Sequence, residues 1–217
     1  MPLSDPALRV LGSLLEKERT TPDVYPLTSQ ALLAACNQKT ARDPVLNLHL
    51  REVEEGLQQL RDRGLAQTVR GAGDRVPKHR QRLTVAMSLT PPESAVLSVL
   101  ILRGPQTAGE LRTRTERYGG IPDVAAVEET LERLAARSPA VVANRGRGPG
   151  QSQDRWAHTL GADDEAMRPR ARPAADSEAS GAATHARAAG DAPDVQELLR
   201  RVEALEARVA ALEEDVA

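Results

Sequence analysis

The densest group of chemically active side chains in this sequence is basic. Residues 68–84 hold one acid, Asp74, against five basic residues: Arg70, Arg75, Lys78, Arg80 and Arg82. Gly71 and Gly73 in the same segment would let the backbone approach a ligand closely. Guanidinium and ammonium groups are the usual contacts to phosphate oxygens, so the segment predicts a nucleic-acid-binding surface. The alternative is that these charges are simply solvated on an exposed hairpin.

A smaller basic group lies further along the chain, where Arg145 and Arg147 stand next to Gly146 and Gly148. Both basic groups fall in segments, 65–89 and 140–160, that have the pattern of a strand, a glycine-rich turn and a second strand. We therefore expect two β-hairpins, with the first the more basic.

Residues 37–48 form a third candidate surface, because side chains with fixed hydrogen-bonding geometry are concentrated there. They are Asn37, Gln38, Lys39, Arg42, Asp43 and Asn47. One interpretation is a partner-binding loop whose Lys39 and Arg42 contact the partner. The other is a long loop closed by its own polar groups, with Asn37 ending a helix and Asp43 beginning a turn before Pro44.

Catalytic and metal-binding patterns are weak. His49, His79, His158 and His185 lack metal-ligand spacing, and each is expected on the surface or on a hairpin. Cys36, the one cysteine, follows Ala35 at the end of a predicted helix and is expected to be a small buried residue. We therefore predict no enzyme activity, no cofactor, no metal and no disulfide. No signal peptide or membrane-spanning run is recognisable, so a cytoplasmic location without membrane contact is expected.

The elements that would position these residues occur twice. VEEGLQQL at 53–60 returns as VEETLERL at 127–134, and LSDPALRVLGSLLEK at 3–17 aligns with LTPPESAVLSVLILR at 89–103. The offset is 86 residues between Leu3 and Leu89 but 74 between Val53 and Val127, so the first copy carries extra residues. These insertions fall at about 19–25 and 37–48. Two small cores are expected for two such modules.

Each copy predicts three helices followed by a hairpin. Ser4 and Thr90 are candidate caps of the first helix, with Thr90 and Glu93 forming a capping box. The second helices are expected at about 28–35 and 107–115, and the third carry the repeated VEE motif. Three helices and a hairpin is the order of elements in a winged helix. The predicted fold is mainly α with short β-hairpins (α+β), with winged-helix domains at 1–88 and 89–161.

Four stretches of the sequence resemble the signature of the bacterial YceH-like proteins. They are LGSLLEKERTTPDVYPLT at 11–28, ACNQKTARDPVLNL at 35–48, GDRVPKHRQRL at 73–83 and LRGPQTAGELRTR at 102–114. The resemblance covers about residues 3–160. It implies a tandem winged-helix fold and no particular activity, because that family is functionally uncharacterised.

The third helices argue against the usual function of a winged helix, which is to place that helix in the major groove of DNA. Acids occupy the turn that would face the bases: Glu52, Glu54 and Glu55 in one copy, and Asp123, Glu128 and Glu129 in the other. Carboxylates there would repel phosphate. The same acids are also explained by the dipole at the helix N-terminus.

Beyond the second module the composition changes twice. Residues 162–193 contain almost no large apolar side chain and are expected to form a flexible linker. From Asp194 a heptad repeat places Val at a and Leu at d, the combination of a parallel two-stranded coiled coil: Val195, Leu198, Val202, Leu205, Val209 and Leu212. The alternative is one amphipathic helix docked on its own domains. The tail at 194–217 lies outside the family resemblance.

The sequence thus predicts a cytoplasmic homodimer that acts by binding. Double-stranded DNA is the first expected ligand, contacted by the first hairpin. The alternative is an adaptor whose two modules dock a protein partner, with the acidic third helices facing a basic surface.

Overall fold

A computed structural model of the protein describes residues 2–71, 73, 75–148 and 150–162. Most of the predicted linker at 162–193 and the whole predicted coiled coil at 194–217 lie outside the described residues. So do the predicted dimerisation residues Val195, Leu198, Val202, Leu205, Val209 and Leu212. The described chain is a mixed α and β structure, rich in helix, with two small antiparallel sheets.

The first repeat contains more elements than three helices and a hairpin. In chain order they are α1 (Asp5–Thr20), η1 (Pro22–Val24), β1 (Leu27–Thr28), α2 (Ser29–Cys36), α3 (Leu50–Asp62), β2 (Ala66–Val69), β3 (Lys78–Gln81) and α4 (Leu83–Ala86). The strand β1 was not predicted, because two residues carry no periodic signal. The second strand of the hairpin was expected to continue toward residue 89, but it ends at Gln81. Residues 83–86 are helical and bury Leu83.

The second repeat has the same order of three helices and a hairpin, with shorter connections between its helices. Its elements are α5 (Pro91–Arg103), α6 (Ala108–Thr115), η2 (Glu116–Tyr118), α7 (Val124–Ala135), β4 (Val142–Asn144) and β5 (Trp156–His158). The six long helices and the second hairpin lie where the sequence predicted them, within a few residues at each end, whereas the first hairpin is shorter than predicted.

Short polar side chains begin α1, α2 and α5, as predicted. The Ser4 hydroxyl accepts a hydrogen bond from the backbone N–H of Ala7, and the Thr28 hydroxyl accepts one from Ala31. Thr90 and Glu93 form the predicted capping box of α5. A cap satisfies backbone N–H groups that have no partner inside the helix, so it fixes where a helix begins.

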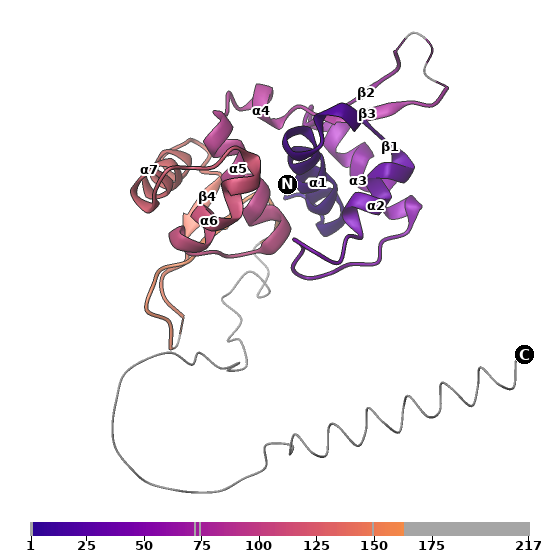
Figure 1. Ribbon diagram of the computed structural model, residues 1–217. Helices are drawn as coiled ribbons and strands as arrows, with labels where there is room; N and C mark the ends of the chain where they lie inside the picture. Colours follow the sequence, from indigo (N-terminus) through magenta and orange to yellow (C-terminus); the bar gives the residue numbers. More distant parts are fainter. Residues whose placement is uncertain (1, 72, 74, 149, 163–217) are drawn as a thin grey trace, which may run out of the picture. The chain divides into compact units, whose positions relative to one another are not determined.

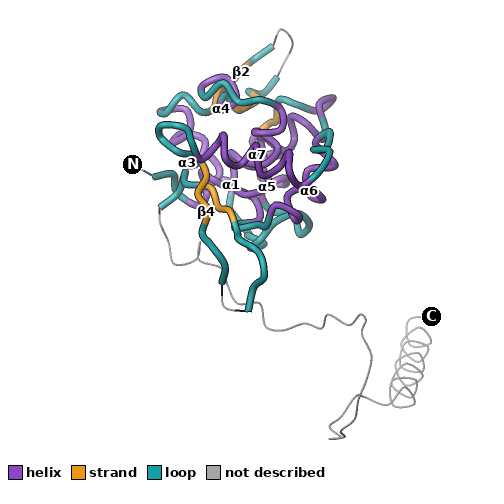
Figure 2. The backbone as a smooth tube through the Cα atoms, turned by 90° about the vertical axis from the view of Figure 1, so that its left-hand side faces the viewer, coloured by secondary structure: helices purple, strands orange, loops and turns teal. Residues whose placement is uncertain are grey.

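The sheets are antiparallel in both repeats. The first has the strand order β1-β3-β2, with Thr68 opposite His79 and Ala66 opposite Gln81. The second pairs β4 with β5, and Val142 lies opposite His158. In Figures 1 and 2 the two hairpins project from opposite sides of the described body.

The two repeats share one core instead of the two small cores expected. Their buried apolar residues form a single continuous cluster that runs from Leu3 to Val142. The helices α1 and α5 lie side by side at its centre (Figures 1 and 2). The first helix of each repeat is apolar on more than one side, so it can face its own repeat and the other repeat at once.

The helices α1 and α5 approach each other closely at Gly12 and Ser98. A Cβ atom on Gly12 would lie 2.8 Å from side-chain atoms of Ile101 and Leu102. The hydroxyl of Ser98 lies 3.4 Å from the carbonyl oxygen of Gly12. These two positions are equivalent in the repeat alignment, and equivalent positions meet each other across a two-fold axis. The repeats therefore pack against each other through their first helices.

Candidate nucleic-acid interface

The first hairpin is anchored to the body by two side chains of β3 that alternate with its basic residues. His79 and Gln81 point inward and are buried, whereas Lys78 is half-buried and Arg80 is exposed. Successive side chains of a strand point to opposite faces, so the alternation determines which residues can reach a ligand.

His79 joins the strands to α2. Its Nε2 lies 3.1 Å from the hydroxyl of Ser29, and its Nδ1 lies 3.2 Å from the hydroxyl of Thr68. Burial lowers the pKa of His79, and the nearby Arg61 lowers it further. The ring is therefore a neutral internal link. His79 lies on the first hairpin, which is one of the two positions expected for it, but its side chain is buried there.

Gln81 ties the base of the hairpin to the first insertion of the first repeat. Its backbone N–H donates to the Tyr25 hydroxyl at 2.7 Å, and its side-chain amide donates to Glu18 Oε2 at 2.5 Å. Burial raises the pKa of Tyr25, so its hydroxyl stays protonated. The insertion thus supports the hairpin.

The basic residues of the first hairpin face solvent. The side chains of Arg70, Arg75, Arg80 and Arg82 are exposed. Arg80 donates through Nε and Nη2 to the neutral Gln67 Oε1, at 3.2 and 2.9 Å, so its charge is not cancelled. Among the residues that the structure describes, none forms an ion pair with any of these four arginines. The hairpin therefore presents a row of uncompensated positive charge.

The second hairpin differs, because an acid cancels part of its charge. Arg147 Nε lies 3.0 Å from Asp154 Oδ1, and Asn144 Nδ2 lies 3.1 Å from Asp154 Oδ2. These hydrogen bonds from Asn144 and Arg147 lower the pKa of Asp154, which keeps it ionised. Arg145 is exposed on the same hairpin. Of the two predicted basic groups, the first is thus the stronger candidate for phosphate contacts.

Most acids of the third helices have structural partners. Glu52 accepts from the backbone N–H of His49 at 2.7 Å, and Glu55 pairs with Arg51 at 2.8 Å. Asp123 caps α7 by accepting from Ala126 N at 2.8 Å, and Glu129 pairs with Arg133 at 2.6 Å. Helix capping and pairs four residues apart thus account for these four acids. Glu54 and Glu128 remain exposed.

Hydrogen bonds from Asn37 and from α1 hold the loop at 37–48 in place. Asn37 follows the end of α2 and exchanges two hydrogen bonds with the backbone of Leu48, both 2.8 Å long. Arg9 of α1 donates to the carbonyl oxygens of Cys36 at 3.1 Å and Pro44 at 2.6 Å. These contacts match the interpretation in which the polar groups close the loop.

Arg42 of this loop is buried instead of exposed, with 5% of its surface accessible. Its two terminal nitrogens lie 3.0 and 2.5 Å from the two carboxylate oxygens of Glu16. It also donates to the carbonyl oxygen of Ala35 and to the side chain of Gln38. Arg42 is therefore a structural residue that a partner cannot reach. Of the other predicted loop residues, Lys39, Asp43 and Asn47 are exposed.

Glu16 connects the loop to the second repeat. Its side chain is 1% exposed and pairs with Arg117 of η2 as well as with Arg42. Sequence reasoning did not single out Arg9, Glu16 or Arg117. Arg9 and Glu16 are seven residues apart, two helical turns, so they share a face of α1. That spacing is a signal for two buried charges, but it does not reveal their partners.

His158 lies in β5 of the second hairpin, again one of the two positions expected for it, and its side chain is also buried. Burial lowers its pKa to about 4, and Arg145 contributes to the shift. Across the described residues, no group of three His, Cys, Asp or Glu side chains is arranged to hold a metal ion. None of the described helices is both long and apolar enough to cross a membrane.

The comparison with known families matches the extent of the motifs. The sequence model of the family described as "Protein of unknown function, DUF480" matches residues 3–151, which span both repeats. The chain belongs to this family. The YceH-like motifs at 11–28, 35–48, 73–83 and 102–114 indicated the same family. The match to DUF480 includes the whole first hairpin and ends between the two strands of the second, after β4 and before β5.

Curated relatives of this DUF480 chain carry the name UPF0502 protein. It is similar to one from Geotalea daltonii, with 54% identity over 155 residues, 71% of each chain. It is 42% identical to one from Dechloromonas aromatica over 210 residues, covering 94% of this chain and 89% of the relative. One from Mesorhizobium japonicum is 41% identical over 210 residues, covering 97% and 92%. These long alignments reach into the C-terminal tail, which was expected to lie outside the resemblance.

Proposed function

We propose that this DUF480 protein is a tandem winged-helix protein that binds double-stranded DNA through its first hairpin, without catalysing a reaction. The order α1, β1, α2, α3, β2 and β3, with the sheet order β1-β3-β2, supports the winged-helix assignment for the first repeat. The second repeat supports it with three helices followed by the pair β4 and β5. In a winged helix the hairpin contacts phosphates or the minor groove.

The observation that carries the proposal is the contrast between the two hairpins. The first presents Arg70, Arg75, Arg80 and Arg82 to solvent with no carboxylate partner in the described part of the chain, whereas Arg147 of the second is paired with Asp154. Each phosphate neutralised by an arginine releases condensed counterions, so uncompensated charge translates into affinity. The contact is assigned to the hairpin and not to α3, because Glu54 and Glu55 are exposed on that helix.

A fluorescence anisotropy titration with a random-sequence duplex at low salt tests the proposal. The wild type is expected to bind at micromolar concentration or tighter. Replacing Arg70, Arg75 and Arg82 together by Gln should weaken binding. It should also reduce the slope of log K against log salt by about 0.9 for each phosphate contact removed. If the wild type at micromolar concentration does not bind the duplex, the DNA proposal is refuted.

Arg145→Gln combined with Arg147→Gln is the matched control in the second hairpin. It removes two basic residues from the equivalent element and is expected to change the salt slope little, since Asp154 already offsets Arg147. Equal losses in both sets of variants would contradict the assignment to the first hairpin. Circular dichroism of each variant would confirm that the fold is retained.

A second candidate function is protein docking by both repeats as an adaptor. The observation that favours it is the projection of the two hairpins from opposite sides of the body (Figures 1 and 2), since one straight duplex would not contact both. Exposed Glu54 and Glu128 would then face a basic partner. Affinity purification with crosslinking, scored for nucleic acid and for protein, separates the two functions.

The absence of catalysis is part of the proposal. Burial raises the pKa of the Cys36 thiol to about 11, which disfavours the reactive thiolate. The two histidines of the hairpins, His79 and His158, are buried with lowered pKa values, so neither ring faces a substrate. We further propose that the protein is cytoplasmic. We also propose that it forms a homodimer through residues 194–217, and the support for this dimer is the heptad pattern of the sequence.

A further inference from the structure

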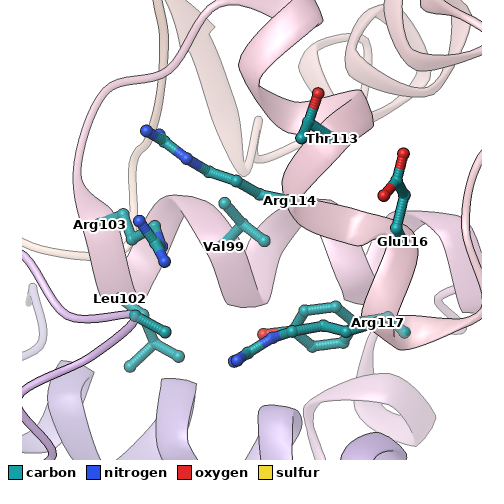
Figure 3. Close-up of a pocket in the computed structure, with 9 residues that line it drawn as sticks. Val99, Leu102, Arg103, Thr113, Arg114, Glu116 and Arg117 are labelled. Atoms are coloured by element: carbon teal, nitrogen blue, oxygen red, sulfur yellow. The ribbon is translucent and has the colours of Figure 1, made fainter.

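A pocket of about 210 Å³ lies beside η2, and its walls come from both repeats (Figure 3). Val99, Leu102 and Tyr118 supply an apolar floor, and Ala41 contributes from the loop at 37–48 of the first repeat. The volume is below the roughly 300 Å³ of sites for drug-sized ligands, so it suits a small molecule.

Three arginines line this pocket against one acid, Glu116. In Figure 3, Arg114 of α6 and Arg117 of η2 extend back toward the side where Arg103 of α5 lies. Arg117 stacks on the Tyr118 ring, with its guanidinium carbon 5.3 Å from the ring centre. Three elements therefore direct cationic groups toward one opening.

The acids near these arginines leave the pocket positive. The buried Glu16 is shared by Arg42, Arg117 and the more distant Lys17, whose Nζ lies 3.9 Å away. Arg114 is 3.7 Å from Glu110, but Glu110 also pairs with Arg155 at 3.0 Å.

Arg103 adds a further positive charge. It is half-buried, and its side chain forms no ion pair with any residue that the structure describes. Positive charge at a partly buried site interacts more strongly with an anion than the same charge in water.

We propose that this pocket binds a small organic anion, with a carboxylate or phosphate held by Arg103, Arg114 and Arg117 and the remaining atoms packed on Leu102 and Tyr118. Guanidinium groups bind both anions through paired N–H donors. Ala41 and Arg117 line the same pocket from different repeats, so the ligand would bridge the loop at 37–48 and the second repeat. The proposal does not depend on DNA binding.

Isothermal titration calorimetry of the full chain, at a constant ionic strength of about 0.15 M set with chloride, provides the test. Inorganic phosphate and succinate are the two probes, and saturable binding of at least one is expected. Arg103→Gln should weaken that binding about tenfold or more, because a charge-assisted contact is lost. Arg114→Gln is the second variant, in case Arg103→Gln does not fold.

Arg51→Gln is the matched control, because Arg51 pairs with Glu55 on α3 and does not line the pocket. It should bind the probe as the wild type does. Saturation by phosphate alone assigns a phosphoryl group, and saturation by succinate assigns a carboxylate. The proposal is overturned if neither probe saturates, if the folded pocket variants bind as well as the wild type, or if Arg51→Gln loses as much affinity as they do.

Discussion

Arg42 and Arg70 have the same side chain but opposite surroundings. Arg42 makes a bidentate pair with Glu16 and is buried between α1 and its own loop, whereas Arg70 is exposed on the first hairpin. The sequence placed both in segments rich in polar residues and predicted surface contacts for both. It could not separate them, because burial of Arg42 depends on a carboxylate 26 residues away in the chain.

Replacing Arg42 by Ala should therefore destabilise the protein. Removal of one partner leaves part of the charge of Glu16 uncompensated in the interior, which costs about 3 kcal/mol of unfolding free energy. Lys39→Ala, in the same loop but exposed, should change that free energy by less than about 0.5 kcal/mol. Urea denaturation of the two variants measures the difference, and equal stabilities would contradict the structural role of Arg42.

His158 should make stability depend on pH. Its pKa is about 4 in the folded protein against 6.5 for an ordinary histidine, because burial disfavours the charged ring. Between these values the unfolded chain binds more protons than the folded one, so the free energy of unfolding falls as pH falls from 6.5 to 4. The full loss corresponds to about 3 kcal/mol.

His158→Gln removes this titration. The difference in unfolding free energy between pH 7 and pH 4 should then be smaller than in the wild type, by up to about 3 kcal/mol. Urea denaturation at the two pH values provides the measurement. His79, whose pKa is also lowered, remains in both proteins and contributes in the same direction. An unchanged pH difference would show that the His158 ring is accessible to protons in the folded state.

At the scale of elements, the positions of the helices and hairpins can be predicted from neighbouring residues, but the close contacts between elements cannot. Caps such as Ser4 and Thr90 could be predicted because they bond to backbone groups three residues away. In the sequence, Gly56 of the VEEGLQQL motif differs from Thr130 at the equivalent position of the second copy, but the alignment does not say why. The structure gives the reason, since α3 passes close to the start of α1 at that point.

Gly56→Ala should destabilise the contact between α1 and α3. The added Cβ would lie 3.0 Å from the backbone nitrogen of Ala7 and 3.1 Å from its Cα, and backbone atoms cannot move aside as a flexible side chain does. A cost of about 1–3 kcal/mol is expected. Gly109→Ala in α6 is the control, with Thr107 Oγ1 at 4.0 Å the nearest atom. It should stabilise the helix by about 0.5 kcal/mol. Thermal unfolding of both variants measures these changes in stability, and a Gly56→Ala protein as stable as the wild type would contradict the prediction.

At the scale of the whole molecule, the two repeats pack together through α1 and α5, and the tail is predicted to pair one chain with another. Gly12 and Ser98 meet at the contact between the repeats, so one core serves both. Glu16 forms ion pairs with Arg42 of the loop at 37–48 and with Arg117 of η2. It thus connects an insertion of the first repeat to the second repeat.

Analytical ultracentrifugation should show the full chain as a dimer and a chain ending at Gly161 as a monomer. The reason is the Val and Leu heptad of residues 194–217, whose apolar stripe is buried when two helices pair. Leu205→Asp in the full chain is the control, since it disrupts one d position without removing the tail. Equal masses for the full and shortened chains would exclude the tail as the dimerisation element.

The sequence by itself determined the family, the duplicated module, the order of its elements and the basic character of the first hairpin. Each of these depends on neighbouring residues or on comparison of the chain with itself. The tertiary structure alone decided that Arg42, His79 and His158 are buried, that Asp154 offsets the second hairpin, and that Arg103, Arg114 and Arg117 share a pocket. These features arise where segments that are distant in the sequence come together. The free energy of a charged group depends on the partners and the solvent that surround it there.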